Sequence, residues 1–227
     1  MAALRNPADA ADAPTEDRRQ HRDRRQRKER QARESLATAA LELILEHGLA
    51  GTTVEAIADR AEVTRRTFSR YFVGKEDAAL DFVRGDGDRI NALLRARPAD
   101  EPPLLAYRRA IGAWLADGES PGWHLQPRTR RLLALVDREP ALFAAYARIR
   151  VDAHQESVRI LAERLGTDAR DVRPVVVVET AAGVLSAALS AWAHAADTAA
   201  GDLPRLVERA YDALASEAAA AHMANSP

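Results

Sequence analysis

The chain has 227 residues, a formal net charge of −1, a hydrophobic fraction of 47% and no cysteine. The absence of cysteine excludes disulfide bonds, thiolate nucleophiles and zinc sites with cysteine ligands. No apolar run has the length of a signal peptide or of a membrane span, so we expect a cytoplasmic protein without a membrane partner. The wealth of Ala, Leu, Arg and Glu, with aromatic residues at only 5%, predicts an all-α fold.

Positive charge is concentrated in the N-terminal third of the chain. Between Arg18 and Lys75 there are fourteen Lys and Arg residues against eight Asp and Glu residues. Because the whole chain is slightly acidic, this distribution favours a polyanion such as nucleic acid as the partner of that third. A solvated surface with many salt bridges is the alternative interpretation.

The first 27 residues are rich in Ala, Asp and Arg and poor in large apolar side chains. Such a segment buries too little apolar surface to offset the entropy lost on ordering, so residues 1–27 are predicted to be a disordered basic arm. Its basic part, residues 18–28, is typical of arms that follow the DNA backbone or enter a minor groove. It is equally typical of a solubilising tail.

Three helices are predicted next, over residues 28–47, 54–61 and 65–72. Each has apolar residues at helical spacing, and Phe68 and Phe72, four positions apart, are expected in the core. Two short helices joined by a tight turn are the signature of a helix-turn-helix.

Threonines mark the starts of the two short helices. Thr52 and Glu55 have the spacing of a capping box before the second helix, and Thr53 is a rival cap. Thr64 is the expected cap of the third helix.

The outer face of the third helix is polar and basic. Packing explains three arginines on a short exposed helix poorly, whereas docking in the DNA major groove explains them well, because Arg donates to guanine edges and phosphates. The alternative for each arginine is a surface salt bridge with Glu62 or Asp59. This face carries Arg65, Arg66, Ser69 and Arg70, with Tyr71 at its edge.

Glycines and prolines divide the rest of the chain. A fourth helix is expected over residues 75–97, with a kink or break at Gly85 and Gly87, because each glycine costs roughly 1 kcal/mol relative to Ala. A linker follows over residues 98–103. The helices expected beyond it cover residues 103–117, 126–138, 139–166, 173–197 and 202–222.

The segment from Thr53 to Glu76 reads TVEAIADRAEVTRRTFSRYFVGKE. Its Ile-Ala, Val-Thr, Thr-Phe, Tyr-Phe and Lys-Glu pairs occur in the order and separations of the TetR family of bacterial regulators, which residues 30–80 strongly resemble. The Arg-Arg-Thr-Phe form is similar to a variant frequent in actinobacterial members. The resemblance implies a helix-turn-helix domain and a helical ligand-binding and dimerisation domain, which we place at residues 28–76 and 77–222. Residues 223–227 are expected to form a short disordered tail.

The resemblance also implies contacts with double-stranded DNA at a palindromic operator. It gives phosphate contacts to Thr53, Tyr71 and Lys75, and we expect base reading from Arg65 or Arg66. Glu62 departs from the family, which usually has glycine there, and a positive φ at this residue would cost about 1 kcal/mol. The full predicted DNA-binding set is Thr53, Thr64, Arg65, Arg66, Thr67, Ser69, Arg70, Tyr71 and Lys75.

A homodimer is the assembly that the resemblance implies, because the last two helices of each subunit build a four-helix bundle in this family. Independently, the helix that opens near Val175 is apolar on nearly every side and needs cover beyond its own domain. A monomeric core is the alternative. The predicted interface residues are Val176, Val177, Val184, Leu185, Ala188, Leu189, Trp192, Leu206 and Tyr211.

A ligand pocket among the C-terminal helices is a further implication of the resemblance. Few buried charges are evident, so the favoured effector is a small apolar molecule. The histidines lack metal-ligand spacing, and neither a metal nor a cofactor is expected. The candidate pocket residues, each of which can also be plain core, are Phe82, Ile90, Leu94, Tyr107, Ile111, Trp114, Trp123, Leu133, Phe143, Tyr146 and Ile149.

Together these expectations describe a ligand-responsive transcription regulator. We expect a repressor that a small molecule releases from its operator by favouring a state with wrongly spaced reading helices. A DNA-binding activator or a ligand-independent regulator is the alternative. An α-helical enzyme is a remote one, because the sequence contains no catalytic-triad signature, phosphate-binding glycine loop or metal cluster.

Overall fold

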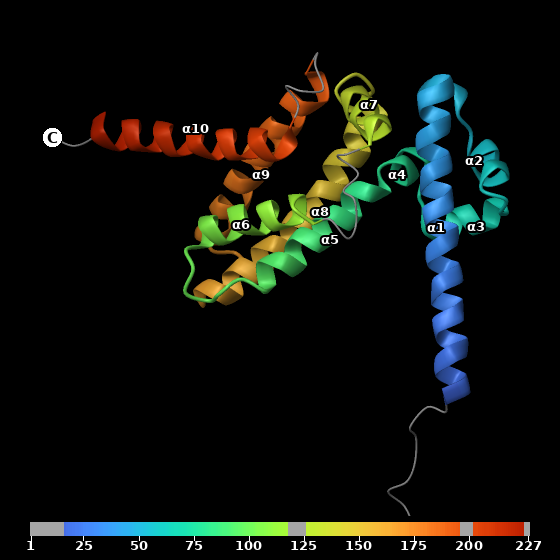
Figure 1. Ribbon diagram of the computed structural model, residues 1–227, viewed down its shortest axis with the longest axis horizontal. Coiled ribbons are helices and arrows are strands. Elements are labelled where there is room, and N and C mark those ends of the chain that lie inside the picture. Colours follow the sequence, from blue (N-terminus) through green and yellow to red (C-terminus); the bar gives the residue numbers. More distant parts are fainter. Residues whose placement is uncertain (1–15, 118–125, 196–201, 225–227) are drawn as a thin grey trace, which may run out of the picture.

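The computed structural model describes residues 16–117, 126–195 and 202–224, with side chains from residue 24 onward. Within these ranges it contains helices and no strand, which confirms the all-α fold. The helices, in the order of the colours in Figure 1, are α1 (Glu16–Gly51), α2 (Val54–Arg60), α3 (Arg65–Tyr71), α4 (Lys75–Ala79), α5 (Asp81–Arg95), α6 (Pro103–Leu115), α7 (Pro127–Val136), α8 (Pro140–Leu165), α9 (Val172–His194) and α10 (Leu203–Ala224).

Helices α1, α2 and α3 form a small unit at one end of the molecule (Figure 1). Leu36 and Ile44 of α1 pack with Ile57 of α2 and with two phenylalanines at the end of α3. The rings of Phe68 and Phe72 lie 5.7 Å apart between centroids, and both side chains are buried as expected. Apolar side chains from all three helices therefore fix the position of α3.

Helix α1 begins earlier than predicted. It starts at Glu16 and not at residue 28, so the disorder expected for residues 16–27 is wrong. Residues 1–15 of the predicted arm lie outside the described residues. The basic segment thus continues α1 into a long helix that extends away from the rest of the chain (Figure 1).

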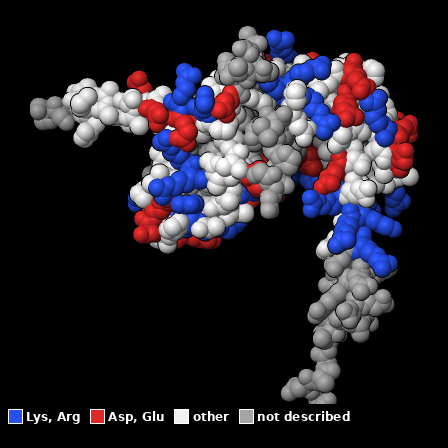
Figure 2. Space-filling model, in the orientation of Figure 1, with Lys and Arg blue, Asp and Glu red and all other residues white. Residues whose placement is uncertain are grey.

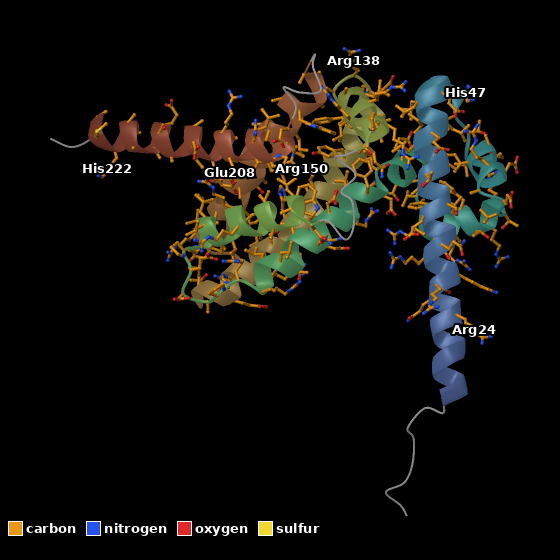
Figure 3. All side chains as sticks on the ribbon, viewed as in Figure 1. Arg24, His47, Arg138, Arg150, Glu208 and His222 are labelled. Atoms are coloured by element: carbon orange, nitrogen blue, oxygen red, sulfur yellow. The ribbon has the colours of Figure 1, made fainter. Side chains whose placement is uncertain are left out.

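The early start of α1 has a local cause. Arg, Gln, Lys and Glu are good helix formers, so this segment can be helical without burying apolar surface. Ion pairs one turn apart add support, between Arg25 and Glu29 at 3.0 Å and between Arg30 and Glu34 at 2.7 Å. Figure 3 shows Arg24 on the same extension.

Caps and a glycine set the boundaries of the first three helices. Gly48, the predicted stop of α1, has φ 72° and kinks the helix before its last residues. Thr53 caps α2, with its hydroxyl oxygen accepting an N–H of the first turn at 3.1 Å, whereas the Thr52 hydroxyl donates to the carbonyl of Gly48. Thr64 caps α3 as predicted, accepting an N–H at 3.1 Å.

The turn between α2 and α3 contains a strained residue. Glu62 has φ 54°, and among the described residues no other non-glycine residue has a positive φ. The turn is closed by the N–H of Val63, which donates to the carbonyl of Ala58 at 2.9 Å. A side chain at such a φ costs about 1 kcal/mol because Cβ approaches a carbonyl oxygen.

We expect Glu62→Gly to raise the free energy of unfolding by about 0.5–1 kcal/mol, because glycine adopts this φ without strain. Urea denaturation measures the change. Glu34→Gly, in the exposed interior of α1, is the matched control and should lower the free energy by about 1 kcal/mol. A loss of stability in both variants would contradict the strain at Glu62.

The helix predicted over residues 75–97 is divided, but not at its glycines. The break lies at Leu80, between α4 and α5. The kink predicted at Gly85 and Gly87 is wrong, because α5 runs through both. Gly87 serves packing, since a Cβ there would lie 2.8 Å from the Cβ of Ala153 on α8.

Helices α5–α10 form the larger C-terminal part of the molecule. Helix α5 packs on α6 and α8, and α9 packs on α6, α7, α8 and α10. Gly166 ends α8 with φ 63°, and α6, α7 and α8 each open with a proline, whose fixed φ suits the first turn of a helix. Helix α10 continues to Ala224, so the first two residues of the tail predicted at 223–227 are helical, and the rest lie outside the described residues.

Helix α9 is long and apolar enough to cross a membrane by length and composition alone. This corrects the expectation that no segment reaches that length. The helix packs against four others, however, and an inner helix of a soluble protein meets the same criterion. Only 33% of its most apolar window is buried in the subunit, so apolar surface on α9 stays open.

Candidate functional site

Helix α3 has a buried and an exposed face. Phe68 on the inner face is 2% exposed. Thr67 and Tyr71 are half-buried at the edges. The outer face presents the four predicted side chains to solvent: Arg65, Arg66, Ser69 and Arg70.

The three arginines of α3 differ in their partners. Arg65 forms an ion pair with Glu55 of α2 at 2.8 Å, and not with Asp59 or Glu62. The two side chains are 73% and 56% exposed, so the pair contributes little and can be exchanged for a phosphate or a base. Arg70 lies over the ring of Tyr71, 4.7 Å from its centroid, and donates to its hydroxyl at 2.6 Å.

Within the described ranges Arg66 has neither an ion pair nor a side-chain partner, whereas Arg65 pairs with Glu55 and Arg70 contacts Tyr71. Its donors need no rearrangement before they meet a partner. The bidentate geometry of guanidinium suits a guanine edge or a phosphate. Arg66 is thus the side chain of α3 best prepared to read a base.

The threonines that are predicted to contact DNA also have a structural role. The hydroxyls of Thr53 and Thr64 already accept N–H groups at the starts of α2 and α3. The Thr64 hydroxyl also lies 3.0 Å from that of Thr67. All three hydroxyls orient the first turn of a helix. Any contact that one of them makes with DNA must therefore be shared with this structural hydrogen bond.

Lys75 is engaged inside the protein. Its ammonium donates to the carbonyls of Leu49 at 2.5 Å and Thr52 at 2.8 Å, where α1 ends. These bonds tie the start of α4 to the end of α1, and they occupy two of the three ammonium donors. The predicted phosphate contact is left with a single donor.

Lys75→Met is expected to lower the free energy of unfolding by about 1.5–3 kcal/mol, the range for hydrogen bonds made by a charged group. Chemical denaturation gives the value. Lys28→Met, an exposed lysine of α1, removes the same charge and should leave stability within about 0.5 kcal/mol of the wild type. Equal effects of the two substitutions would show that the two carbonyl contacts contribute nothing.

A chain of polar contacts joins the end of α3 to α5. The buried carboxylate of Asp77 accepts the N–H of Val73, directly after α3, at 3.2 Å. Its other oxygen accepts from Arg84 of α5 at 2.9 Å, and Arg84 also contacts Asp81. Arg33 of α1 donates to Asp81 at 2.7 and 3.0 Å. These contacts connect α5 to α1 and to the end of α3.

A cavity of about 80 Å³ lies in the C-terminal part, between α5, α6, α7, α8 and α9. Figure 3 shows Arg150, one of its lining residues, among these helices. The walls are mainly apolar and aromatic. The predicted pocket residues that line it are Phe82, Ile90, Tyr107, Trp114, Leu133, Tyr146 and Ile149.

Three predicted pocket residues of the described ranges do not line the cavity. Leu94 and Ile111 are fully buried core residues, and Phe143 is 56% exposed on the outside of α8. Trp123 lies outside the described residues. Apolar periodicity finds the inner face of a helix but does not separate cavity wall from core, which explains these errors.

The cavity is less apolar than predicted, because polar and ionisable residues also line it. Sequence reasoning missed them because it took only apolar and aromatic side chains as candidates for the cavity wall. Asp86 lies four positions from both Phe82 and Ile90, and Arg150 lies four positions from Tyr146, so helical spacing is the signal that could have found these two. The missed polar residues are Asp86, Arg150, His154, Ser157 and Ser186.

Most of these polar groups are satisfied within the protein. Ser157 donates to Asn91 at 2.7 Å and shares a hydrogen bond with Tyr107 at 3.0 Å. Arg150 donates to Ser186 at 3.1 Å. No group of three or more side chains suited to hold a metal is found in the described part of the chain.

The predicted dimer-interface residues lie mostly inside their own subunit. Of the nine, only Val176 is exposed, at 54%. Leu185 and Leu189 line the cavity. The others are buried or half-buried in the core of the subunit: Val177, Val184, Ala188, Trp192, Leu206 and Tyr211.

The open face of α9 carries small residues that sequence reasoning passed over. Gly183, Ala187 and Ala191 are exposed and follow Val176 along one side of the helix. Their spacing of seven, four and four residues keeps them in one row. A row of small side chains lets another helix approach closely.

Comparison with known proteins agrees with this architecture at both ends of the chain. Residues 36–79 match the family described as bacterial regulatory proteins, tetR family, and residues 101–219 match the MftR C-terminal domain. The chain is 36% identical over 192 residues to the HTH-type transcriptional regulator TcmR of Streptomyces glaucescens, covering 81% of this chain and 83% of TcmR. It is 26% identical over 166 residues to the putative mycofactocin biosynthesis transcriptional regulator MftR of Mycobacterium tuberculosis, covering 70% and 77% of the two chains.

Solved structures provide further similar proteins. SmeT, the repressor of the Stenotrophomonas maltophilia multidrug efflux pump SmeDEF, matches with a TM-score of 0.46 and 22% identity, over 78% of this chain and 85% of SmeT. The family matches and the identity to TcmR over most of both chains settle the relationship. The chain belongs to the TetR family of bacterial regulatory proteins and is a DNA-binding transcriptional regulator.

Proposed function

We propose that the protein is a dimeric cytoplasmic repressor that a small, largely apolar molecule releases from a palindromic operator. The observation that carries the proposal is the polar link from Val73 through Asp77 to Arg84. It joins the DNA-reading unit to α5, the helix whose Phe82 and Asp86 line the cavity. One helix is therefore shared by the effector site and the support of α3.

The DNA-reading part of the proposal rests on the exposed face of α3. In a dimer, two copies of α3 would enter successive major grooves about 34–36 Å apart. Basic residues on the early part of α1, such as Arg27 and Lys28, are placed to follow the flanking phosphates (Figure 2). Base contacts from α3 would then select the operator sequence.

The dimer in this proposal is formed by α9 and α10. The exposed row of Val176, Gly183, Ala187 and Ala191 is apolar and small, and a second copy of α9 can cover it. Helix α10 projects from the body, and its last residues, 215–224, are exposed (Figure 1). Two antiparallel pairs of these helices would build a four-helix bundle with twofold symmetry.

The release mechanism follows from the shared helix. An effector that fits the cavity only when α5 is displaced would favour that displaced state over the DNA-bound one. Because α5 holds Asp77 through Arg84, the displacement would change the separation of the two α3 helices. The cavity supports a ligand-responsive regulator over a ligand-independent one.

Selection of bound DNA from a random pool tests the proposal. We expect enrichment of a palindrome with two half-sites, and loss of binding when the effector is present in a metabolite library. Failure to enrich any duplex at low salt would overturn the DNA-reading surface. Enrichment of a site without twofold symmetry would overturn the dimer.

A further inference from the structure

Asp86 is an unusual member of the cavity wall. It lies on α5, and its Oδ1 accepts the indole N–H of Trp114 on α6 at 3.0 Å. Its Oδ2 is buried and accepts no hydrogen bond from the described residues. A buried carboxyl oxygen without a partner costs free energy, so a ligand that supplies a donor gains that energy on binding.

The other charged and polar groups around the cavity have partners. The Arg150 guanidinium donates to Ser186 and lies 5.6 Å from the ring centroid of Tyr146. His154 contacts Glu179 at 3.3 Å. Ser157 takes part in the hydrogen bonds with Asn91 and Tyr107. Among the described lining residues, Asp86 Oδ2 is thus the polar atom left for a ligand.

The surroundings of Oδ2 suit a cation. Asp86 is the acidic residue of the described lining, and aromatic rings of Phe82, Tyr107, Trp114 and Tyr146 line the same cavity. Aromatic faces attract a cation within about 6 Å, and the attraction is stronger when the site excludes water. A carboxylate together with aromatic walls is a suitable environment for an ammonium group on an apolar body.

We propose that the effector is a hydrophobic amine, whose ammonium group donates to Asp86 Oδ2 while its apolar part packs against the aromatic walls. This inference rests on the proposed effector role of the cavity. It adds a positively charged group to the expected largely apolar ligand, and it assigns Asp86 as the residue that selects for that charge.

Binding of such an amine would release a proton. Burial raises the pKa of Asp86 to about 8, against the lowering effects of the Trp114 hydrogen bond and the charge of Arg89. The other ionisable groups facing this region are Arg89, which is paired with Asp117, Tyr107 on α6, and Arg150, His154 and Tyr146 on α8. Burial lowers the pKa of His154, so its ring is neutral when Asp86 begins to ionise. The ammonium requires the ionised carboxylate, so affinity should rise with pH up to about 8.

Three matched probes test the proposal on the full-length protein: naphthylmethylamine, naphthylmethanol and naphthoic acid. Quenching of tryptophan fluorescence measures their affinities, because Trp114 lines the cavity. We expect the amine to bind at least about ten-fold more tightly than the alcohol or the acid at pH 8. Its affinity should fall by up to about ten-fold per pH unit below that pH, while binding of the alcohol stays constant.

Substitutions separate Asp86 from general effects of charge. Asp86→Asn keeps the acceptor for Trp114 and should abolish both the preference for the amine and its pH dependence, while the alcohol still binds and reports an intact cavity. Asp88→Asn removes the same charge from an exposed position of α5 and should behave as the wild type.

The outcomes distinguish this inference from the proposed function. If the alcohol or the acid binds the wild type as tightly as the amine, or if Asp86→Asn keeps the preference, the amine proposal is overturned and the cavity remains an effector site. If none of the three probes binds, the cavity fails as an effector site and the amine proposal fails with it.

Discussion

Replacing Ala187 on α9 with Glu is expected to convert the dimer into a monomer and to lower operator affinity by about 100-fold or more. Ala187 is exposed in the subunit and lies in the middle of the row of small residues on α9. In a twofold interface the substitution places two carboxylates near the same axis. Desolvation of each costs several kcal/mol, and the like charges repel each other.

Sedimentation equilibrium gives the oligomeric state, and fluorescence anisotropy with the selected operator gives the affinity. Ala92→Glu, the same substitution at an exposed position of α5, is the matched control and should leave the dimer intact. A dimeric Ala187→Glu variant with normal DNA binding would place the interface elsewhere. A monomeric variant that keeps full affinity would show that one subunit reads the operator alone.

The second large effect is expected from Arg66→Ala on α3. A bidentate contact to a base contributes about 1–3 kcal/mol to the free energy of binding. Because the dimer contains two copies of Arg66, the substitution should weaken operator binding by about 2–6 kcal/mol. Arg65→Ala should weaken operator binding less than Arg66→Ala does, because the Arg65 guanidinium must break its ion pair with Glu55 before it binds DNA. The difference arises from the partners of the two side chains, since both are exposed on the same helix.

Affinity for the selected operator and for a random duplex should be measured at several salt concentrations. Arg66→Lys keeps the charge but loses the bidentate geometry, so it should lower affinity for the operator while non-specific binding is preserved. Equal losses on both duplexes for Arg66→Ala, with a smaller salt slope, would make Arg66 a phosphate contact. A larger loss for Arg65→Ala would assign base reading to Arg65.

The helix-turn-helix was predictable because its determinants are close together in the sequence. Thr53 and Thr64 begin α2 and α3 with their own side chains, and Gly48 supplies the positive φ near the end of α1. The spacing of Phe68 and Phe72 places both on one face regardless of what covers it. The family resemblance pointed to Glu62 as a departure from the usual glycine, and the structure gives this residue a φ of 54°.

Contacts between residues that are remote in the sequence determine features that local sequence patterns did not predict. The family resemblance predicted a phosphate contact for Lys75, whereas in the structure its ammonium donates to the carbonyls of Leu49 and Thr52. The sequence predicted a kink at Gly85 and Gly87, but α5 packs against α6 and α8 and remains continuous through both residues. In each case a tertiary contact outweighs the local preference.

From residue 28 onward, the sequence by itself determined which segments are helical and where most of them start and end. It also determined which side chains of α3 face away from the core, because helix propensity, capping and apolar periodicity act within a few residues. Only the tertiary structure decided which apolar faces meet. It buried Val184 and Trp192 within the subunit, left the small residues of α9 open, and placed Asp86 in an aromatic cavity. The physical reason is that the hydrophobic effect is non-directional, so an apolar stripe requires cover without specifying which surface supplies it.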